Sequence, residues 1–197
     1  MARPSMAAQR VEEILDALES CILKYGIQAT SLENIADTAG VKRTILRHYI
    51  GNRDDIIVAL SRRYREKYTL QWQQVIEWLP AKNRTDAIID TLFSVGSTER
   101  LHTTIIGEAI FSEAKRLDAI KLDQEAIMEE FHQHLNDALT TDFPDASPDT
   151  ISLVSSGLYA NYLMAESLLP LKFTEQVYQL KLSAKLLCST LEDSKTQ

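Results

Sequence analysis

The sequence predicts an all-α fold, and three observations lead to this prediction. Apolar residues recur at the three- and four-residue spacing of helices along most of the 197-residue chain. All five prolines stand between these periodic segments or at their starts, where they interrupt no helix. They are Pro4, Pro80, Pro144, Pro148 and Pro170. No Asn-Gly or Asp-Gly hairpin turn occurs, and the one strand-like run, residues 103–111, is better explained as part of a helix with Ile105, Ile106, Ala109 and Ile110 inward.

The first two predicted helices are separated by a glycine stop. Residues 10–25 carry an apolar face at helical spacing, and Gly26 follows as a natural C-terminal residue. Thr30 and Glu33 match the T-x-x-E capping box, which predicts the start of a second helix that ends near Ala39.

A third helix follows after a very tight turn. Gly40 and Val41 leave room only for a sharp change of direction, and residues 42–49 form a helix with Leu46 inward. Two helices joined in this way, with a basic stretch after them, form the arrangement that places a recognition helix in the major groove of DNA.

The rest of the chain is read as one long helix and five further helices. Asp54 and Asp55 lie where a helix N-terminus favours negative charge, which predicts a connecting helix from Asp54 to Leu79. The five helices beyond Pro80 are expected at residues 84–95, 99–115, 119–140, 148–169 and 174–191.

Each of the last two predicted helices has two apolar stripes. On the first, one stripe is Ile151, Val154, Leu158, Tyr162 and Ala165, and the other is Leu153, Gly157, Ala160, Met164 and Leu168. On the second, one stripe is Val177, Leu180, Ala184, Leu187, Cys188 and Leu191, and its companion is Tyr178, Leu182 and Leu186. A helix at the end of a small domain rarely needs burial on two sides. We expect a homodimer through Pro148 to Leu169 and Thr174 to Leu191, the alternative being a central helix in a monomeric bundle.

The charge of the chain is unevenly distributed. The formal net charge is −7, yet residues 1–68 hold eleven Lys and Arg against nine Asp and Glu. Within residues 39–68 the balance is eight basic against three acidic residues. Such asymmetry is typical of a polyanion-binding end on an acidic body, although a basic run is also found on ordinary solvated surfaces.

Cysteine usage and hydropathy predict a cytoplasmic location. Cys21 and Cys188 lie far apart, so neither a disulfide framework nor a zinc ribbon is indicated. Residues 1–9 contain no apolar stretch of a secretory signal. The most apolar long window, residues 153–171, is interrupted by polar residues, so we expect no membrane association.

Signatures of catalysis and of bound metal are weak. The chain has no phosphate-binding glycine loop, nucleophile elbow or HExxH motif, so we expect no enzyme and no cofactor. Glu130 and His134 stand four residues apart, and Glu129 and His132 three apart, but no third ligand is apparent. We read this segment as a solvated acidic face and expect no metal.

Three segments between Arg10 and Leu60 carry a family resemblance. They read YGIQATS at 25–31, IADTAGV at 35–41 and LRHYIGNRDDII at 46–57. Together they closely resemble the DNA-binding domain of the tetracycline repressor (TetR) family of bacterial transcriptional regulators. The resemblance covers about the first third of the chain and implies a homodimeric, ligand-responsive regulator, usually a repressor.

The resemblance implies phosphate contacts at four positions. Thr30 and Ser31 would touch the DNA backbone at the start of the second helix, and Tyr49 and Arg53 match phosphate-contacting positions. Three of them have a simpler reading: Thr30 only caps its helix, Tyr49 only packs, and Arg53 only pairs with Asp54 or with a neighbour at the helix start.

The recognition helix implied by the resemblance opens with Lys42, Arg43 and Thr44, which would face base edges. Arg43 is the expected bidentate partner of guanine. The sequence departs from the family at Arg47, where an aromatic residue is usual, and at Ile50, where Phe is commoner. Arg47 would add a phosphate or base contact, and Ile50 would still fill the core.

In the resembled family the helices after the connector enclose a pocket for a small-molecule effector. Candidate lining residues combine apolar bulk with a few polar groups. They are Phe93, His102, Ile106, Phe111, Met128, Phe131, Tyr159 and Tyr162. Each of them also fits a plain core position.

Taken together, these observations predict two domains. Residues 1–53 form a helix-turn-helix DNA-binding domain, and residues 54–197 form a helical effector-binding and dimerisation domain. We expect a regulator, most simply a repressor, that binds an inverted-repeat operator in double-stranded DNA and is released by a small molecule. The alternative is a helical dimer that shapes DNA or binds proteins without an effector.

Overall fold

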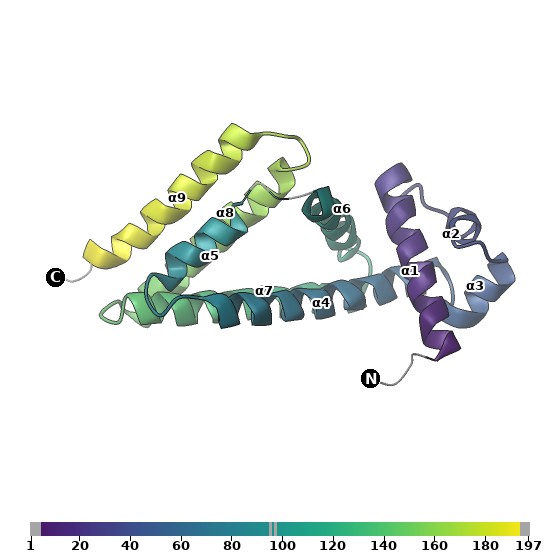
Figure 1. The fold of residues 1–197 in the computed structure, drawn as a ribbon, viewed down its shortest axis with the longest axis horizontal. Coiled ribbons are helices and arrows are strands. Elements are labelled where there is room, and N and C mark those ends of the chain that lie inside the picture. The colour runs from purple at the N-terminus through teal and green to yellow at the C-terminus, as the bar shows by residue number, and fades with distance from the viewer. Residues whose placement is uncertain (1–4, 95, 97, 194–197) are drawn as a thin grey trace. The chain divides into compact units, whose positions relative to one another are not determined.

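The computed structural model describes residues 5–94, 96 and 98–193, which form nine helices and no strand (Figure 1). The helices are α1 (Met6–Tyr25), α2 (Leu32–Thr38), α3 (Arg43–Ile50), α4 (Arg53–Trp78), α5 (Arg84–Leu92), α6 (Thr98–Glu113), α7 (Asp118–Asp142), α8 (Pro148–Leu168) and α9 (Thr174–Asp193). The all-α prediction is confirmed. The largest differences are at α1, which begins at Met6 rather than at Arg10, and at α5, which ends at Leu92, while Val95 lies outside the described residues.

The chain packs into two compact units. Unit 1 comprises Met1–Glu66 and Ile105–Gln124, and unit 2 comprises Lys67–Thr104 and Glu125–Gln197. Unit 1 therefore adds the first half of α4, the end of α6 and the start of α7 to the first three helices. The functional boundary expected after residue 53 stays a prediction.

The core of unit 1 is built mainly by the inward faces of α1 to α4. Ile14 and Leu18 of α1, Ile35 of α2 and Leu46 of α3 have no exposed surface. Burial of such side chains contributes about 1.5 to 3 kcal/mol each. The packing fixes the direction in which α3 presents its other faces.

The start of α2 differs from the predicted capping box. The N-cap is Ser31, whose hydroxyl accepts a hydrogen bond from the backbone N–H of Asn34, and the Asn34 side chain accepts one from the Ser31 N–H. The predicted Thr30–Glu33 box is wrong because Thr30 is buried and its hydroxyl donates to the carbonyl oxygen of Gly26 at 2.8 Å.

A guanidinium anchors α1 to α4 within unit 1. Arg63 donates to the carboxylates of Glu12, Asp16 and Glu19 at 3.1, 2.8 and 2.5 Å. Arg65 likewise pairs with the buried Asp123. The basic run of residues 39–68 is therefore not one cationic surface, since these two arginines are neutralised inside the unit.

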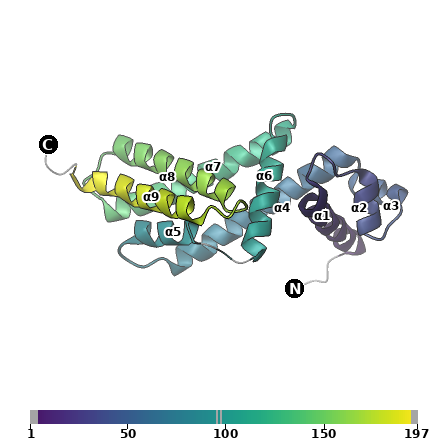
Figure 2. The same ribbon diagram turned by 90° about the horizontal axis from the view of Figure 1, so that it is seen from above.

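In unit 2, α8 and α9 lie side by side, as both views show (Figures 1 and 2). A Cβ atom on Gly157 would lie 2.9 Å from Cδ1 of Leu187, so glycine permits the close approach of the two helices. No helix in the described part of the chain combines the length and apolar character that crossing a bilayer requires.

Candidate functional site

The helix that the sequence analysis expects to read DNA is α3. Its exposed charged side chains are mainly cationic. Leu46 is buried, whereas Lys42, Arg43, Thr44 and Arg47 are exposed. Lys42 is the N-cap residue and makes no side-chain cap bond. No ion pair holds Lys42, Arg43 or Arg47 in the part of the chain that the structure describes, so their charges are available to a polyanion.

Sequence reasoning missed Ile45 and His48 on the outer side of α3. Ile45 is 42% exposed and stands four residues before Tyr49 in the helix. The ring of His48 meets that of Tyr49 edge to face at 5.4 Å. The helical register, with Leu46 inward, was the signal that could have found both residues. An apolar side chain at this place suits contact with a thymine methyl group.

The four expected phosphate contacts occupy different environments. Ser31 and Tyr49 are exposed, but Thr30 is only 2% exposed and its hydroxyl is engaged with Gly26. Arg53 is partly buried, at the first residue of α4. Ser31 and Tyr49 are thus accessible to the phosphate backbone of DNA, whereas Thr30 lies in the interior.

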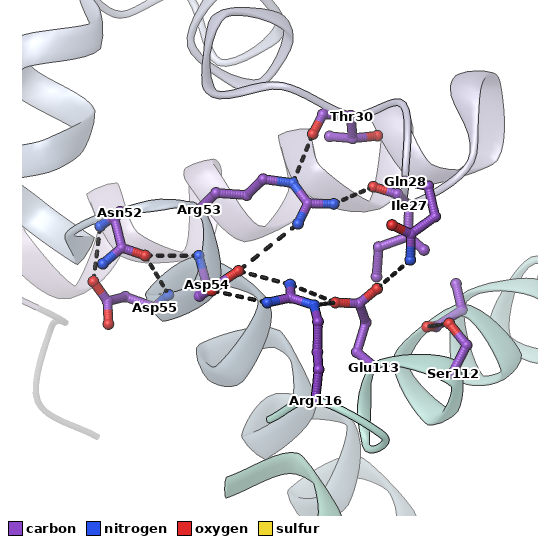
Figure 3. Close-up of polar contacts among 11 residues, drawn as sticks. Ile27, Gln28, Thr30, Asn52, Arg53, Asp54, Asp55, Ser112, Glu113 and Arg116 are labelled. Atoms are coloured by element: carbon purple, nitrogen blue, oxygen red, sulfur yellow. Dashed lines mark hydrogen bonds and ion pairs between the residues drawn. The ribbon is translucent and has the colours of Figure 1, made fainter. Parts of the chain in front are cut away.

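Arg53 is held by the loop between α1 and α2, as Figure 3 shows. Its Nε donates to the carbonyl oxygen of Thr30 at 2.9 Å, and its Nη2 donates to the carbonyl oxygen of Ile27. Its Nη1 lies 3.8 Å from Oδ1 of Asp54. The simpler reading, a pair with Asp54, therefore accounts for only part of the contacts of Arg53.

The network continues from Asp54 to a buried carboxylate (Figure 3). Arg116 donates to both oxygens of Asp54, at 2.9 and 2.7 Å, and its Nε donates to Oε2 of Glu113 at 2.7 Å. Gln28 donates to the other oxygen of Glu113 at 2.5 Å. All these residues belong to unit 1. The hydrogen bonds that Arg116 donates to Asp54 lower the pKa of Asp54. The same bonds, followed by the one to Glu113, raise the pKa of Arg116.

Unit 2 contains a cavity of about 570 Å³. Its walls come from α4, α5, α6 and α8. The lining residues are Lys67, Tyr68, Gln71, Trp72, Gln74, Val75 and Trp78 on α4, Ile88, Thr91 and Leu92 on α5, Glu99, Arg100, Thr103 and Thr104 on α6, and Tyr162 and Glu166 on α8. Its volume lies within the range of about 300 to 1,000 Å³ that small-molecule sites have.

Of the eight residues expected to bind a ligand, Tyr162 lines this cavity. Phe93 and Phe131 are buried in the core of unit 2, Tyr159 packs against Phe131, and Ile106 is buried in the core of unit 1. His102, Phe111 and Met128 are exposed on the surface. The core reading, kept open above, thus fits the buried members of the set.

Sequence reasoning missed most of the cavity because α4 was taken as a connector. Tyr68, Trp72 and Val75 recur at helical spacing beyond the part of α4 that unit 1 contains. Large aromatic side chains on a supposed linker were the available signal, since a connector needs no such face.

The acidic segment of α7 shows hydrogen bonds between side chains. Glu130 accepts a hydrogen bond from Thr69 at 2.8 Å and lies 3.6 Å from His134, while Nδ1 of His132 lies 3.0 Å from the hydroxyl of Ser155. Within the described residues no group of three His, Cys, Asp or Glu side chains is placed to hold a metal ion.

The segment that contains α3 matches a known family model. Residues 14–60 match the family model described as bacterial regulatory proteins, tetR family, a family of regulators rather than enzymes. Comparison of the sequence with curated proteins gives no match.

Solved structures share the fold over nearly the whole chain. A TetR transcription regulator from Haloarcula marismortui is 19% identical, with 92% of this chain and 97% of that chain covered and a TM-score of 0.79. A putative transcriptional regulator from Pseudomonas aeruginosa is 19% identical, with coverage of 94% and 91% and a TM-score of 0.74. GusR from Salmonella enterica is 14% identical, with coverage of 95% and 100% and a TM-score of 0.71. Residues 14–60 therefore carry the DNA-binding domain of the tetR family of bacterial regulatory proteins, and the chain has the fold of TetR transcriptional regulators, as the sequence resemblance implies.

Proposed function

We propose that the protein is a repressor that binds an inverted-repeat operator as a homodimer and releases it when a small molecule binds. The observation that carries this proposal is the set of exposed cations at the start of α3, Lys42, Arg43 and Arg47, on a helix anchored by the buried Leu46. A helix held in this way offers base-reading side chains at its N-terminal turns. Because such a protein acts on chromosomal DNA, we also propose a cytoplasmic location.

The second apolar stripes of α8 and α9 support the homodimer. Most of their large side chains remain exposed, whereas Leu168 is partly buried and the first stripes are largely buried within unit 2. The exposed members are Leu153, Met164, Tyr178, Leu182 and Leu186, and the neighbouring Leu163 on α8 is also exposed. Covering such a surface contributes about 25 cal/mol for each Å² of apolar area. A second copy supplies the same surface, and a two-fold axis would pair α8 and α9 with their counterparts.

The course of α6 supports the coupling of ligand to DNA binding. Its Arg100 and Thr104 line the cavity in unit 2, and its last residue, Glu113, is buried in unit 1 beside Arg116. A ligand that favours one placement of α6 would shift the equilibrium between binding and non-binding forms by its differential affinity for the two.

Selection of random duplex DNA by the purified protein tests the proposal. We expect enrichment of an inverted repeat whose half-sites lie about 34 Å apart, one turn of the double helix. Titration of the enriched duplex at two salt concentrations should show affinity that falls steeply with salt. Salt dependence without sequence enrichment would instead support the alternative, a DNA-shaping dimer with no effector.

A pair of variants separates base reading from general charge. Arg43→Ala should lose about 1 to 3 kcal/mol of binding free energy on the selected duplex and relax the preference at one base pair. Lys82→Ala removes one charge from an exposed lysine between α4 and α5 and should leave base preference unchanged. Equal affinity of Arg43→Ala and wild type for the selected site would refute the assignment of Arg43.

A further inference from the structure

The ionised groups that line the cavity of unit 2 balance one another. Lys67 and Arg100 are cationic, and Glu99 and Glu166 are anionic. Lys67 and Glu99 are exposed, so water and salt screen their charges. The cavity therefore offers no excess of either sign to a charged ligand.

The two less exposed ions of the cavity are already engaged. Nη2 of Arg100 donates to Oε1 of Glu166 at 3.0 Å, and the hydroxyl of Thr104 donates to Oε2 of Glu166 at 2.6 Å. Arg100 also donates to the carbonyl oxygens of Thr91 and Leu92 at the end of α5. A ligand carboxylate or ammonium group would have to replace these bonds, at the cost of leaving a partly buried charge without its partner.

The other polar groups of the cavity are uncharged. Burial raises the pKa of Tyr68 and of Tyr162, so both phenols keep their protons at neutral pH. The amides of Gln71 and Gln74 lie in the same wall. Phenols and amides both donate and accept hydrogen bonds, which suits ligand hydroxyl, carbonyl or amide groups.

Aromatic rings dominate the apolar part of the wall. The two tryptophans of the chain, Trp72 and Trp78, both line the cavity, together with Tyr68 and Tyr162. Trp72 is held edge to face by Tyr68 at 6.2 Å and by Phe131 at 5.6 Å. A ring fixed as that of Trp72 favours a flat aromatic partner, because stacked and edge-to-face contacts add to the free energy of burial, whereas Trp78 is 68% exposed.

We propose that this cavity binds an uncharged, planar aromatic compound of two or three rings that carries hydroxyl, carbonyl or amide groups. That this compound acts as the effector rests on the function proposed above. Its binding to the protein without DNA is independent of that function.

Three probes that share a naphthalene ring and differ in charge test the proposal. They are 2-naphthol, which is neutral at pH 7, the anion 2-naphthoate, and the cation (2-naphthylmethyl)trimethylammonium. Calorimetric titration of the full-length protein without DNA should give 2-naphthol the tightest binding, by about tenfold over either ion. Tighter binding of either ion, or no binding of any probe at about 1 mM, overturns the proposal.

The site of binding is read from the indole N–H signals of the two tryptophans in a heteronuclear NMR spectrum. Trp72→Phe and Trp78→Phe assign the two signals. Both should shift on addition of 2-naphthol if it occupies the cavity. Binding that leaves both signals in place locates the probe elsewhere and overturns the assignment.

A charge variant supplies a positive test. Glu166→Gln keeps the shape and one oxygen acceptor for Arg100, and its amide N–H can donate to the hydroxyl of Thr104, but it gives the cavity a net positive charge. We expect 2-naphthoate to bind about fivefold tighter than to wild type and 2-naphthol to change less than about threefold. Gln71→Glu offers the opposite test at an exposed position of the same wall, with the ammonium probe gaining affinity. Failure of both ions to respond shows that the probes do not enter this cavity.

Failure of the ligand proposal and failure of the proposed function remain distinct. If 2-naphthol binds and shifts both indole signals but leaves the affinity for the selected duplex unchanged, the ligand class holds and effector release is wrong for this compound. If an inverted repeat is selected but no probe binds, DNA reading holds and the ligand class is wrong.

Discussion

The guanidinium of Arg116 makes two parallel hydrogen bonds with the carboxylate of Asp54, from Nη1 to Oδ2 at 2.9 Å and from Nη2 to Oδ1 at 2.7 Å. Arg116 lies in the turn between α6 and α7, and Asp54 is the second residue of α4. The pair ties that turn to the helix that directly follows α3. Such a two-point contact fixes orientation as well as distance.

Replacement of Arg116 should destabilise unit 1 through Glu113 more than through Asp54. Asp54 is half exposed, so its pair is worth little, but Glu113 is 1% exposed and would keep only Gln28 as a partner. We expect Arg116→Gln to lower the free energy of unfolding by about 1 to 3 kcal/mol, measured by urea denaturation. Adding Glu113→Gln should recover part of the loss. Lys115→Gln, at the exposed neighbouring position, is the control, and an equal loss there contradicts the argument.

Acid should remove the contribution of Asp54 to stability. Folding lowers the pKa of Asp54, first through the hydrogen bonds from Arg116. A carboxyl group of this kind stabilises the folded state above its unfolded pKa of about 3.9, and the contribution is lost as pH falls through the lower folded pKa. The difference in unfolding free energy between wild type and Asp54→Asn should therefore be constant above about pH 5 and shrink below about pH 4. Parallel stability profiles of the two proteins down to about pH 2 would contradict this assignment.

Arg53 should stabilise the loop between α1 and α2 in addition to any contact that it makes with a DNA phosphate. Arg53→Lys keeps the charge but cannot make both bonds to the carbonyl oxygens of Thr30 and Ile27. We expect it to lower the free energy of unfolding by about 1 to 2 kcal/mol, whereas Arg47→Lys, on the exposed face of α3, should change it by less than about 0.5 kcal/mol. If Arg53→Lys unfolds like wild type but binds DNA more weakly, its role is contact with DNA alone.

A single charge on the exposed apolar side of α8 and α9 should separate the proposed dimer without unfolding the chain. Leu186 is 70% exposed and Leu153 is 74% exposed, so Leu186→Glu or Leu153→Glu leaves the core intact. A buried, unpaired carboxylate at the interface disfavours association strongly. Light scattering after gel filtration should show a monomer with unchanged helical circular dichroism. Leu70→Glu, at a 58% exposed leucine of α4, should stay dimeric, and dimers of the α8 and α9 variants would argue for a different interface.

Periodicity was sufficient to predict the helices, because each buries one face at a fixed spacing. The stripes of α8 and α9 separate in the structure into a largely buried and an exposed set, as two-sided patterns should. The capping box of α2 failed by one residue, since T-x-x-E at Thr30 overlaps with Ser31 and Asn34. The local pattern alone could not decide between Thr30 and Ser31 as the N-cap, because the burial of Thr30 depends on distant parts of the chain.

Contacts between residues far apart in sequence account for the remaining differences. Arg53 bonds carbonyl oxygens 23 and 26 positions away, and Gln28 reaches Glu113 across 85 positions. The spacing of residues along the sequence does not predict such pairs. The cavity was likewise hidden, because its walls come from four helices and the charge of Arg100 is cancelled only once Glu166 of α8 stands beside it.

The layout of α6 has a consequence for how such a chain can diversify. The turns that line the cavity, from Glu99 to Thr104, precede those that bury Ile110 and Glu113 in unit 1. On the function proposed above, substitutions in the first part would change which compound binds while the second part keeps its packing. One helix would thereby let the ligand site change without redesign of the part of the chain that contacts DNA.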